Sequence, residues 1–230
     1  MTEVTRGTGA VVVGVAATLA FVVLRAVVAF GGHEPLAVDV WWHDLMVALS
    51  SDVWIVVAWV PAVVGGTVGM IVVGALLILA FLWRGRRWDA ATLAIAMVAV
   101  VAIGATMAAV IGRTRPTDSL AESVATSFPS GHTAVATTVV VVLGLLLRRW
   151  YIWVLGAAWV IVMMWSRTYL HAHWLSDVVA GMLEGIAVAT VVWACVTAVR
   201  ARRLARTRSS AATREEPPVL EAPIESTSNP

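Results

Sequence analysis

The chain has 230 residues, 60% of them hydrophobic and 13% charged, and its formal net charge is +2. Ordinary soluble domains carry about 25% charged residues, so this composition argues against a soluble domain and favours an integral membrane protein. The single cysteine, Cys195, excludes an internal disulfide. The sequence has no Gly-rich nucleotide loop and no zinc-type cysteine pattern, and nothing in it indicates a nucleic-acid partner.

Six apolar segments have the length, or nearly the length, needed to cross about 30 Å of hydrocarbon as helices. Their approximate bounds are Thr8–Phe30, Ala62–Trp83, Ala90–Ile111, His132–Leu147, Tyr151–Arg167 and Trp174–Val199. The fourth segment is short and needs polar residues to anchor its ends. The sequence therefore predicts an all-α, polytopic membrane helix bundle with about six transmembrane helices. A secretory signal peptide is the alternative for the first segment, but its apolar run is longer than such peptides usually have.

Two further stretches fall outside these spans. Trp41–Val60 is rich in tryptophan and precedes Pro61 and the Gly65-Gly66 pair, so we expect an amphipathic segment at the membrane surface. Residues 200–230 turn first basic and then rich in Pro, Glu and Ser, which is typical of disorder. The predicted organisation is a membrane domain over residues 1–199 and a disordered cytoplasmic tail over 200–230.

The arginines predict the orientation of the chain in the membrane. Most of them fall on one side of the predicted spans, namely Arg6, Arg84, Arg86, Arg87, Arg148, Arg149, Arg200, Arg202, Arg203, Arg206, Arg208 and Arg214. Because cytoplasmic loops are enriched in Arg and Lys, this side is expected to be cytoplasmic, with both termini. The other side would then hold the polar segments 112–116, 128–132 and 166–177.

These three polar segments carry the residue types needed for phosphate chemistry. Arginine side chains bind phosphate oxygens with planar, permanently charged forks. Ser130 and Gly131 stand where a helix begins, and a helix N-terminus favours an anion. His173 and Asp177 are four residues apart, so on a helix the carboxylate can orient the imidazole for nucleophilic attack.

The three segments, in this order, resemble the signature of the type 2 phosphatidic acid phosphatase superfamily. That signature is Lys, six residues and Arg-Pro; then Pro-Ser-Gly-His; then Ser-Arg, five residues, His, three residues and Asp. The second and third parts match at 129–132 and at 166–177. The first part matches only at Arg115 and Pro116, since Ala108 stands where the family has lysine.

The resemblance implies a role for each matched residue. His173 would be the nucleophile that forms a phosphohistidine, Asp177 its partner, and His132 the acid that protonates the leaving group. The implied phosphate ligands are Arg115, Ser130, Gly131 and Arg167. No metal and no cofactor is implied.

Three charged residues lie outside this assignment. Arg113 is an outer-loop cation, and we expect it to supply part of the charge missing at Ala108 by contacting phosphate. Glu184 lies within the last span, where a carboxylate is a candidate functional group. Arg25 lies near the end of the first span and can extend its charge toward water.

The resemblance implies a cell-membrane lipid phosphate phosphatase with its active site on the extracytoplasmic face. The substrate would be a phosphomonoester or a diphosphate of a lipid, such as a polyprenyl diphosphate, phosphatidic acid or phosphatidylglycerol phosphate. The motifs do not choose among these lipids. Two alternatives remain open: a phosphotransferase that uses the same site, and a catalytically silent lipid-binding or scaffold protein, which the missing lysine motivates.

Overall fold

The regular structure of the chain is helical, as expected. The computed structural model describes residues 3–121 and 124–215. The helices are α1 (Glu3–Phe30), α2 (Ala37–Ala48), α3 (Asp52–Val64), α4 (Thr67–Trp83), α5 (Arg87–Ile111), α6 (Gly131–Leu147), α7 (Trp150–Tyr169) and α8 (Leu175–Glu215). The one β-type pairing in the described residues is an isolated bridge between Thr114 and Thr126. The predicted all-α class is confirmed.

The helices account for the predicted membrane spans, although their number is approximate. Within the described residues, four helices are long and apolar enough to cross a membrane, and the number is five if the bent pair formed by α3 and α4 is counted as one span. α6 is a shorter apolar helix of 17 residues. Large apolar side chains such as Val12, Leu19 and Val68 are exposed on the helices, which is the surface that lipid would cover.

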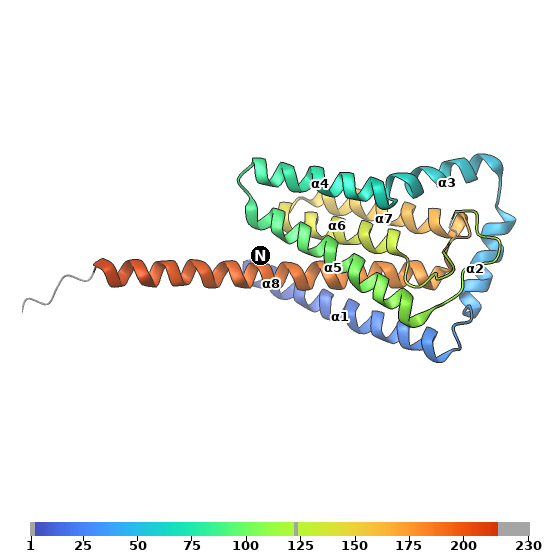
Figure 1. Ribbon diagram of the computed structural model, residues 1–230, viewed down its shortest axis with the longest axis horizontal. Helices are drawn as coiled ribbons and strands as arrows, with labels where there is room; N and C mark the ends of the chain where they lie inside the picture. Colours follow the sequence, from blue (N-terminus) through green and yellow to red (C-terminus); the bar gives the residue numbers. More distant parts are fainter. Residues whose placement is uncertain (1–2, 122–123, 216–230) are drawn as a thin grey trace, which may run out of the picture. The chain divides into compact units, whose positions relative to one another are not determined.

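The segment predicted to lie at the surface is divided between two elements. α2 runs across one end of the other helices of the first unit (Figure 1). α3 instead forms a pair with α4 that bends by 46° at the Gly65-Gly66 break. Pro61 lies inside α3 rather than ending it. Counted together with α4 as one span, α3 would move the start of the second span from the predicted Ala62 to Asp52.

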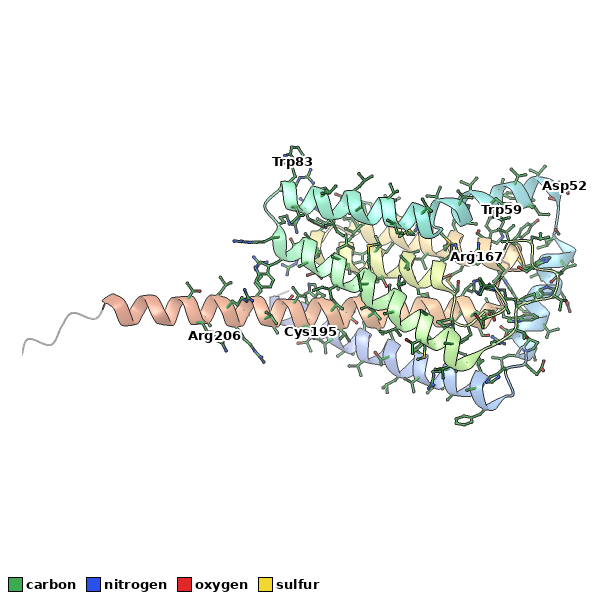
Figure 2. All side chains as sticks on the ribbon, in the orientation of Figure 1. Asp52, Trp59, Trp83, Arg167, Cys195 and Arg206 are labelled. Carbon is green, nitrogen blue, oxygen red and sulfur yellow. The ribbon has the colours of Figure 1, made fainter. Side chains whose placement is uncertain are left out.

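The polar segments are brought together because consecutive helices run in opposite directions. α5 ends at Ile111, α6 begins at Gly131, α7 ends at Tyr169 and α8 begins at Leu175, all at the end that α2 crosses (Figure 1). Gly112 closes α5 with φ of 59°, a left-handed conformation that glycine adopts without strain. In Figure 2 Arg167 lies among the helices toward this end, whereas Trp83 lies at the opposite end of α4.

Close packing of α8 on α6 sets the geometry between the second and third polar segments. A Cβ atom added to Gly181 would lie 2.4 Å from the Ser130 carbonyl oxygen, and one added to Gly185 would lie 2.6 Å from that of Ala134. Small residues four apart allow helix backbones to approach in this way. The contact also lets the Ser130 amide donate a hydrogen bond of 3.0 Å to the Asp177 carbonyl.

The chain divides into two compact units, Met1–Val196 and Thr197–Pro230. The first unit contains the helices that carry the polar segments. In the second unit α8 continues as helix to Glu215, so the prediction of disorder from Arg200 onward is wrong for residues 200–215. An arginine- and alanine-rich sequence has a high helix propensity, which explains the continuation. The remainder of the predicted tail, 216–230, lies outside the described residues.

Candidate active site

His173 lies in the short connection between α7 and α8 and is 4% exposed. Its Nδ1 atom is 2.8 Å from the Ser127 carbonyl oxygen, and its Nε2 atom is 3.2 Å from Nη1 of Arg115. A carbonyl oxygen only accepts hydrogen bonds and a guanidinium only donates them. These partners therefore assign the proton to Nδ1 and leave the lone pair of Nε2 directed toward Arg115.

The surroundings of His173 favour the neutral imidazole. Burial lowers the pKa of His173 below its ordinary value of 6.5, and the positive charges of Arg115 and Arg167 lower it further. Asp177 acts in the opposite direction on this pKa, but burial is the largest effect. A neutral imidazole whose Nε2 atom carries no proton is the form that can attack phosphorus.

Asp177 is close to His173 but does not make the shortest contact with it. Its Oδ2 atom lies 3.7 Å from Nδ1 of His173, which is an ion-pair distance rather than a hydrogen bond. The same oxygen accepts the Trp174 amide at 2.9 Å. The predicted placement of both residues on one helix is wrong, since His173 precedes the start of α8 at Leu175. The Ser127 carbonyl makes the shorter orienting contact.

Arg113 faces away from a phosphate position and into a buried ionic cluster. Its Nη1 atom donates to Oδ1 of Asp177 at 2.6 Å, and its Nη2 atom donates to Oδ2 of Asp39 at 2.7 Å. The side chains of all three residues are 0% exposed. These contacts do not favour the expectation that Arg113 binds phosphate in place of the lysine missing at Ala108. They place the guanidinium between two carboxylates.

Asp39 connects α2 to the start of α8. Its Oδ1 atom accepts the Ser176 amide and its Oδ2 atom accepts the Ser176 hydroxyl, each at 2.7 Å. Its Oδ2 atom also accepts the Leu36 amide at 2.9 Å, which caps the first turn of α2. This role could not be predicted from the sequence, because Asp39 looks like an ordinary acid in the first turn of a surface helix.

Arg115 and Arg167 are the two arginines that lie near both histidines. Arg115 donates through Nε to the Val124 carbonyl at 2.6 Å and through Nη1 to the Ala172 carbonyl, which fixes its guanidinium beside His173. Arg167 lies in the last turn of α7 and is 1% exposed. Both positive charges act electrostatically on His132 and on His173. Two guanidinium groups whose charges act on the same imidazoles are suited to binding phosphate oxygens.

The Ser130-Gly131-His132 segment opens α6 and borders the same region. The Ser130 hydroxyl is buried and accepts a hydrogen bond from Thr133 at 3.3 Å. A Cβ atom added to Gly131 would meet nothing within 4 Å, so there is open space beside this residue. His132 is partly buried, and its Nε2 atom would lie 3.7 Å from a Cβ atom on Gly66. The break between α3 and α4 thus borders the His132 ring.

Glu184 lies apart from these groups. It is 1% exposed, and among the described residues neither of its carboxylate oxygens has a hydrogen-bond partner. A Cβ atom on Gly104 would lie 3.5 Å from Oε1, so α5 approaches this side chain closely. The possibility that Glu184 pairs with a distant arginine finds no support in the described residues.

The part of the chain that carries this site is similar to a known protein family. Residues 89–201 match the model of the PAP2 superfamily. The matched segment contains all three polar segments. The resemblance drawn from the motifs is therefore confirmed.

Two known proteins are similar to the chain. An undecaprenyl-diphosphatase of Sulfolobus acidocaldarius is 34% identical over 114 residues, which cover 46% of this chain and 55% of that protein. The chain thus spans about half the length of this curated relative. The crystal structure of a transmembrane PAP2 type phosphatidylglycerolphosphate phosphatase from Bacillus subtilis superposes with a TM-score of 0.69 at 20% identity. The superposition covers 78% of this chain and 93% of the other. The chain has the fold of a multi-pass membrane protein.

Proposed function

We propose that the protein is an integral-membrane phosphatase that hydrolyses a phosphomonoester or a diphosphate of a lipid. The observation that carries the proposal is the pair of contacts made by His173, whose Nε2 atom lies 3.2 Å from Nη1 of Arg115 and whose Nδ1 atom lies 2.8 Å from the Ser127 carbonyl oxygen. The superfamily match and the apolar helices support a lipid substrate. The two relatives carry names of enzymes for lipid phosphates, an undecaprenyl diphosphate and phosphatidylglycerol phosphate, and both are candidate substrates here.

The proposed reaction has two steps. Nε2 of His173 attacks phosphorus, the bond to the leaving oxygen breaks with its electron pair, and His132 gives that oxygen a proton. Water then attacks the phosphorus of the phosphohistidine while His132 takes a proton from the water. The bond between Nε2 and phosphorus breaks, its electron pair returns to Nε2, and inorganic phosphate leaves. Arg115 and Arg167 hold the phosphate oxygens, and the open space beside Gly131 allows its amide to donate to one of them.

We also propose that the site faces the extracytoplasmic side. The arginines in or next to the α4–α5 and α6–α7 connections lie at the end of the first unit opposite the site, namely Arg84, Arg86, Arg87, Arg148 and Arg149. Positive residues concentrate on the cytoplasmic side of a membrane protein. In this orientation the lipid headgroup reaches Arg115 and His173 from the outer leaflet.

The test is phosphate release by purified protein in detergent against undecaprenyl diphosphate, phosphatidylglycerol phosphate and phosphatidic acid. The wild type should release phosphate from at least one lipid, and it should also do so in the presence of a chelator. His173→Ala should abolish release, whereas the matched variant His33→Ala, which alters an exposed histidine outside the site, should not. Trapped phosphoenzyme should be labile to acid and stable to base. Transfer to an added alcohol without release to water would favour a phosphotransferase, and inactivity on every lipid would favour a silent binder.

A further inference from the structure

Two histidines and an aspartate outside the phosphate site lie within metal-binding distance of one another. His43 belongs to α2, Asp118 to the connection after α5, and His171 to the connection after α7. His43 Nε2 is 3.0 Å from Oδ1 of Asp118, and His171 Nδ1 is 2.8 Å from Oδ2 of Asp118. One ligand atom from each residue lies within 4.8 Å of the other two.

The three side chains form a packed and partly buried cluster. The His171 side chain is 7% exposed, and its Nε2 atom has no hydrogen-bond partner in the described part of the chain. Its φ of 50° lies in the left-handed region, which residues other than glycine seldom adopt. The imidazole rings of His43 and His171 have centroids 4.9 Å apart, and the Trp174 ring packs on His43 at 5.5 Å. Asp118 is 44% exposed, so an ion can reach the cluster from water.

We propose that His43, Asp118 and His171 form a binding site for a zinc-type divalent cation. Two imidazole nitrogens and one carboxylate oxygen are a ligand set that zinc accepts, whereas magnesium and calcium prefer oxygen ligands alone. Three protein ligands leave a fourth position for water. The carboxylate between two imidazoles supplies the negative charge that a divalent cation needs. No residue of this cluster belongs to the proposed phosphate site, so the inference does not depend on the proposed function.

The position of the three ligands indicates what the ion would do. Asp118 follows Arg115 by three residues, and His171 precedes His173 by two. The two connections already share a hydrogen bond of 3.0 Å from the Leu120 amide to the Leu170 carbonyl. An ion bound to all three ligands would join these connections to α2. It would stabilise the folded chain, because a preformed site is absent from the unfolded state.

Metal binding can be measured directly on the full chain in detergent, after the affinity tag is removed and the protein is treated with a chelator and dialysed. Cobalt(II), which substitutes for zinc, should bind at one ion per chain with a visible absorption band, and zinc should displace it. Zinc should also raise the unfolding temperature, while magnesium at the same concentration should not. His43→Gln, Asp118→Asn and His171→Asn should each weaken cobalt binding by at least about tenfold. Loss of a residue that only orients a metal ligand already lowers metal affinity by about tenfold or more, and these three residues would bind the ion directly.

The matched control is His33→Asn, which alters an exposed histidine that also has a positive φ, 67°. Asparagine tolerates the left-handed backbone, so His33→Asn and His171→Asn carry similar backbone costs and differ in ligation. Cobalt binding should be normal in His33→Asn. The proposal is wrong if wild type takes up no stoichiometric cobalt, or if the three ligand variants bind it as well as His33→Asn does. Should His171→Asn fail to fold, His43→Gln and Asp118→Asn still decide the question.

Discussion

Nη1 of Arg113 lies 2.6 Å from Oδ1 of Asp177, and the other end of the same guanidinium binds Asp39 at 2.7 Å. Asp177 in turn lies beside Nδ1 of His173 at 3.7 Å. The charge of Arg113 is therefore balanced by two buried carboxylates. α2, through Asp39, is thereby connected to the residues around the nucleophile.

This cluster predicts that Arg113→Gln and Asp39→Asn lower the stability of the folded protein more than they weaken phosphate binding. Removing one member of a buried ion pair leaves an uncompensated charge and typically costs about 3–5 kcal/mol. Each variant should lower the unfolding temperature, and the losses should not add in the double variant, because the two side chains share one network. Thermal unfolding of the four proteins in detergent measures this. A rise in KM with an unchanged unfolding temperature in Arg113→Gln would instead indicate that Arg113 binds phosphate.

The lowered pKa of His173 predicts activity that persists into mild acid. Attack requires the neutral imidazole, and burial keeps the pKa below 6.5, so kcat/KM should decline only at a pH below that value. Stability should have a matching dependence. Below about pH 6.5 the unfolded chain binds a proton at this residue that the folded chain does not, so stability falls as the pH drops from there toward the folded-state pKa. His173→Gln should lose this part of the slope, and an identical slope in the variant would contradict the assignment.

The proposed role of His132 predicts a dependence on the leaving group. His132→Ala should slow hydrolysis of a lipid phosphomonoester by about 100-fold or more, since general acid catalysis typically contributes about 10²–10⁴-fold. An activated aryl phosphate needs little help from an acid, so its hydrolysis should be far less affected. Steady-state rates on both substrates provide the measurement. Equal losses on the two would argue against His132 as the acid.

The glycine contact between α8 and α6 predicts a positional effect on catalysis. In Gly181→Ala the new methyl group would lie 2.4 Å from the Ser130 carbonyl oxygen, a backbone atom that can move only with the start of α6. We expect at least about a tenfold loss of kcat, because small displacements of a catalytic group are costly. Gly9→Ala is the matched control, since a Cβ atom there meets nothing within 4 Å. Similar activity of the two variants would show that the contact does not set the geometry of the site.

The proposed orientation predicts which loops react with a membrane-impermeant thiol reagent in intact cells. The native Cys195 is exposed and should first be replaced in Cys195→Ser. In that background Thr117→Cys should be labelled from outside and Arg84→Cys only after permeabilisation; both positions are exposed in the structure. The reverse pattern would place the site in the cytoplasm.

The fold class, the approximate spans and the residues of the proposed phosphate site could be predicted from the sequence. Apolar runs long enough to span a bilayer have few structural options, because backbone polar groups in lipid must be satisfied within helices. Motif residues such as Ser130 and His173 were identifiable because their types and spacing are specific to one kind of chemistry. The same reasoning treated Pro61 as a break and expected the second span to begin at Ala62, whereas Pro61 lies inside α3, which forms a bent pair with α4.

Which groups orient the motif residues depends on contacts that form in the folded chain. Nδ1 of His173 binds a backbone carbonyl, that of Ser127, and a carbonyl belongs to every residue and leaves no mark in a sequence. Arg113 and Asp39 are 74 residues apart, and their pairing follows from how α2 crosses the end of the helices. The sequence shows that Arg113 carries a positive charge, but it does not show which groups the side chain contacts. A long side chain reaches in many directions, and the buried carboxylates around it select one.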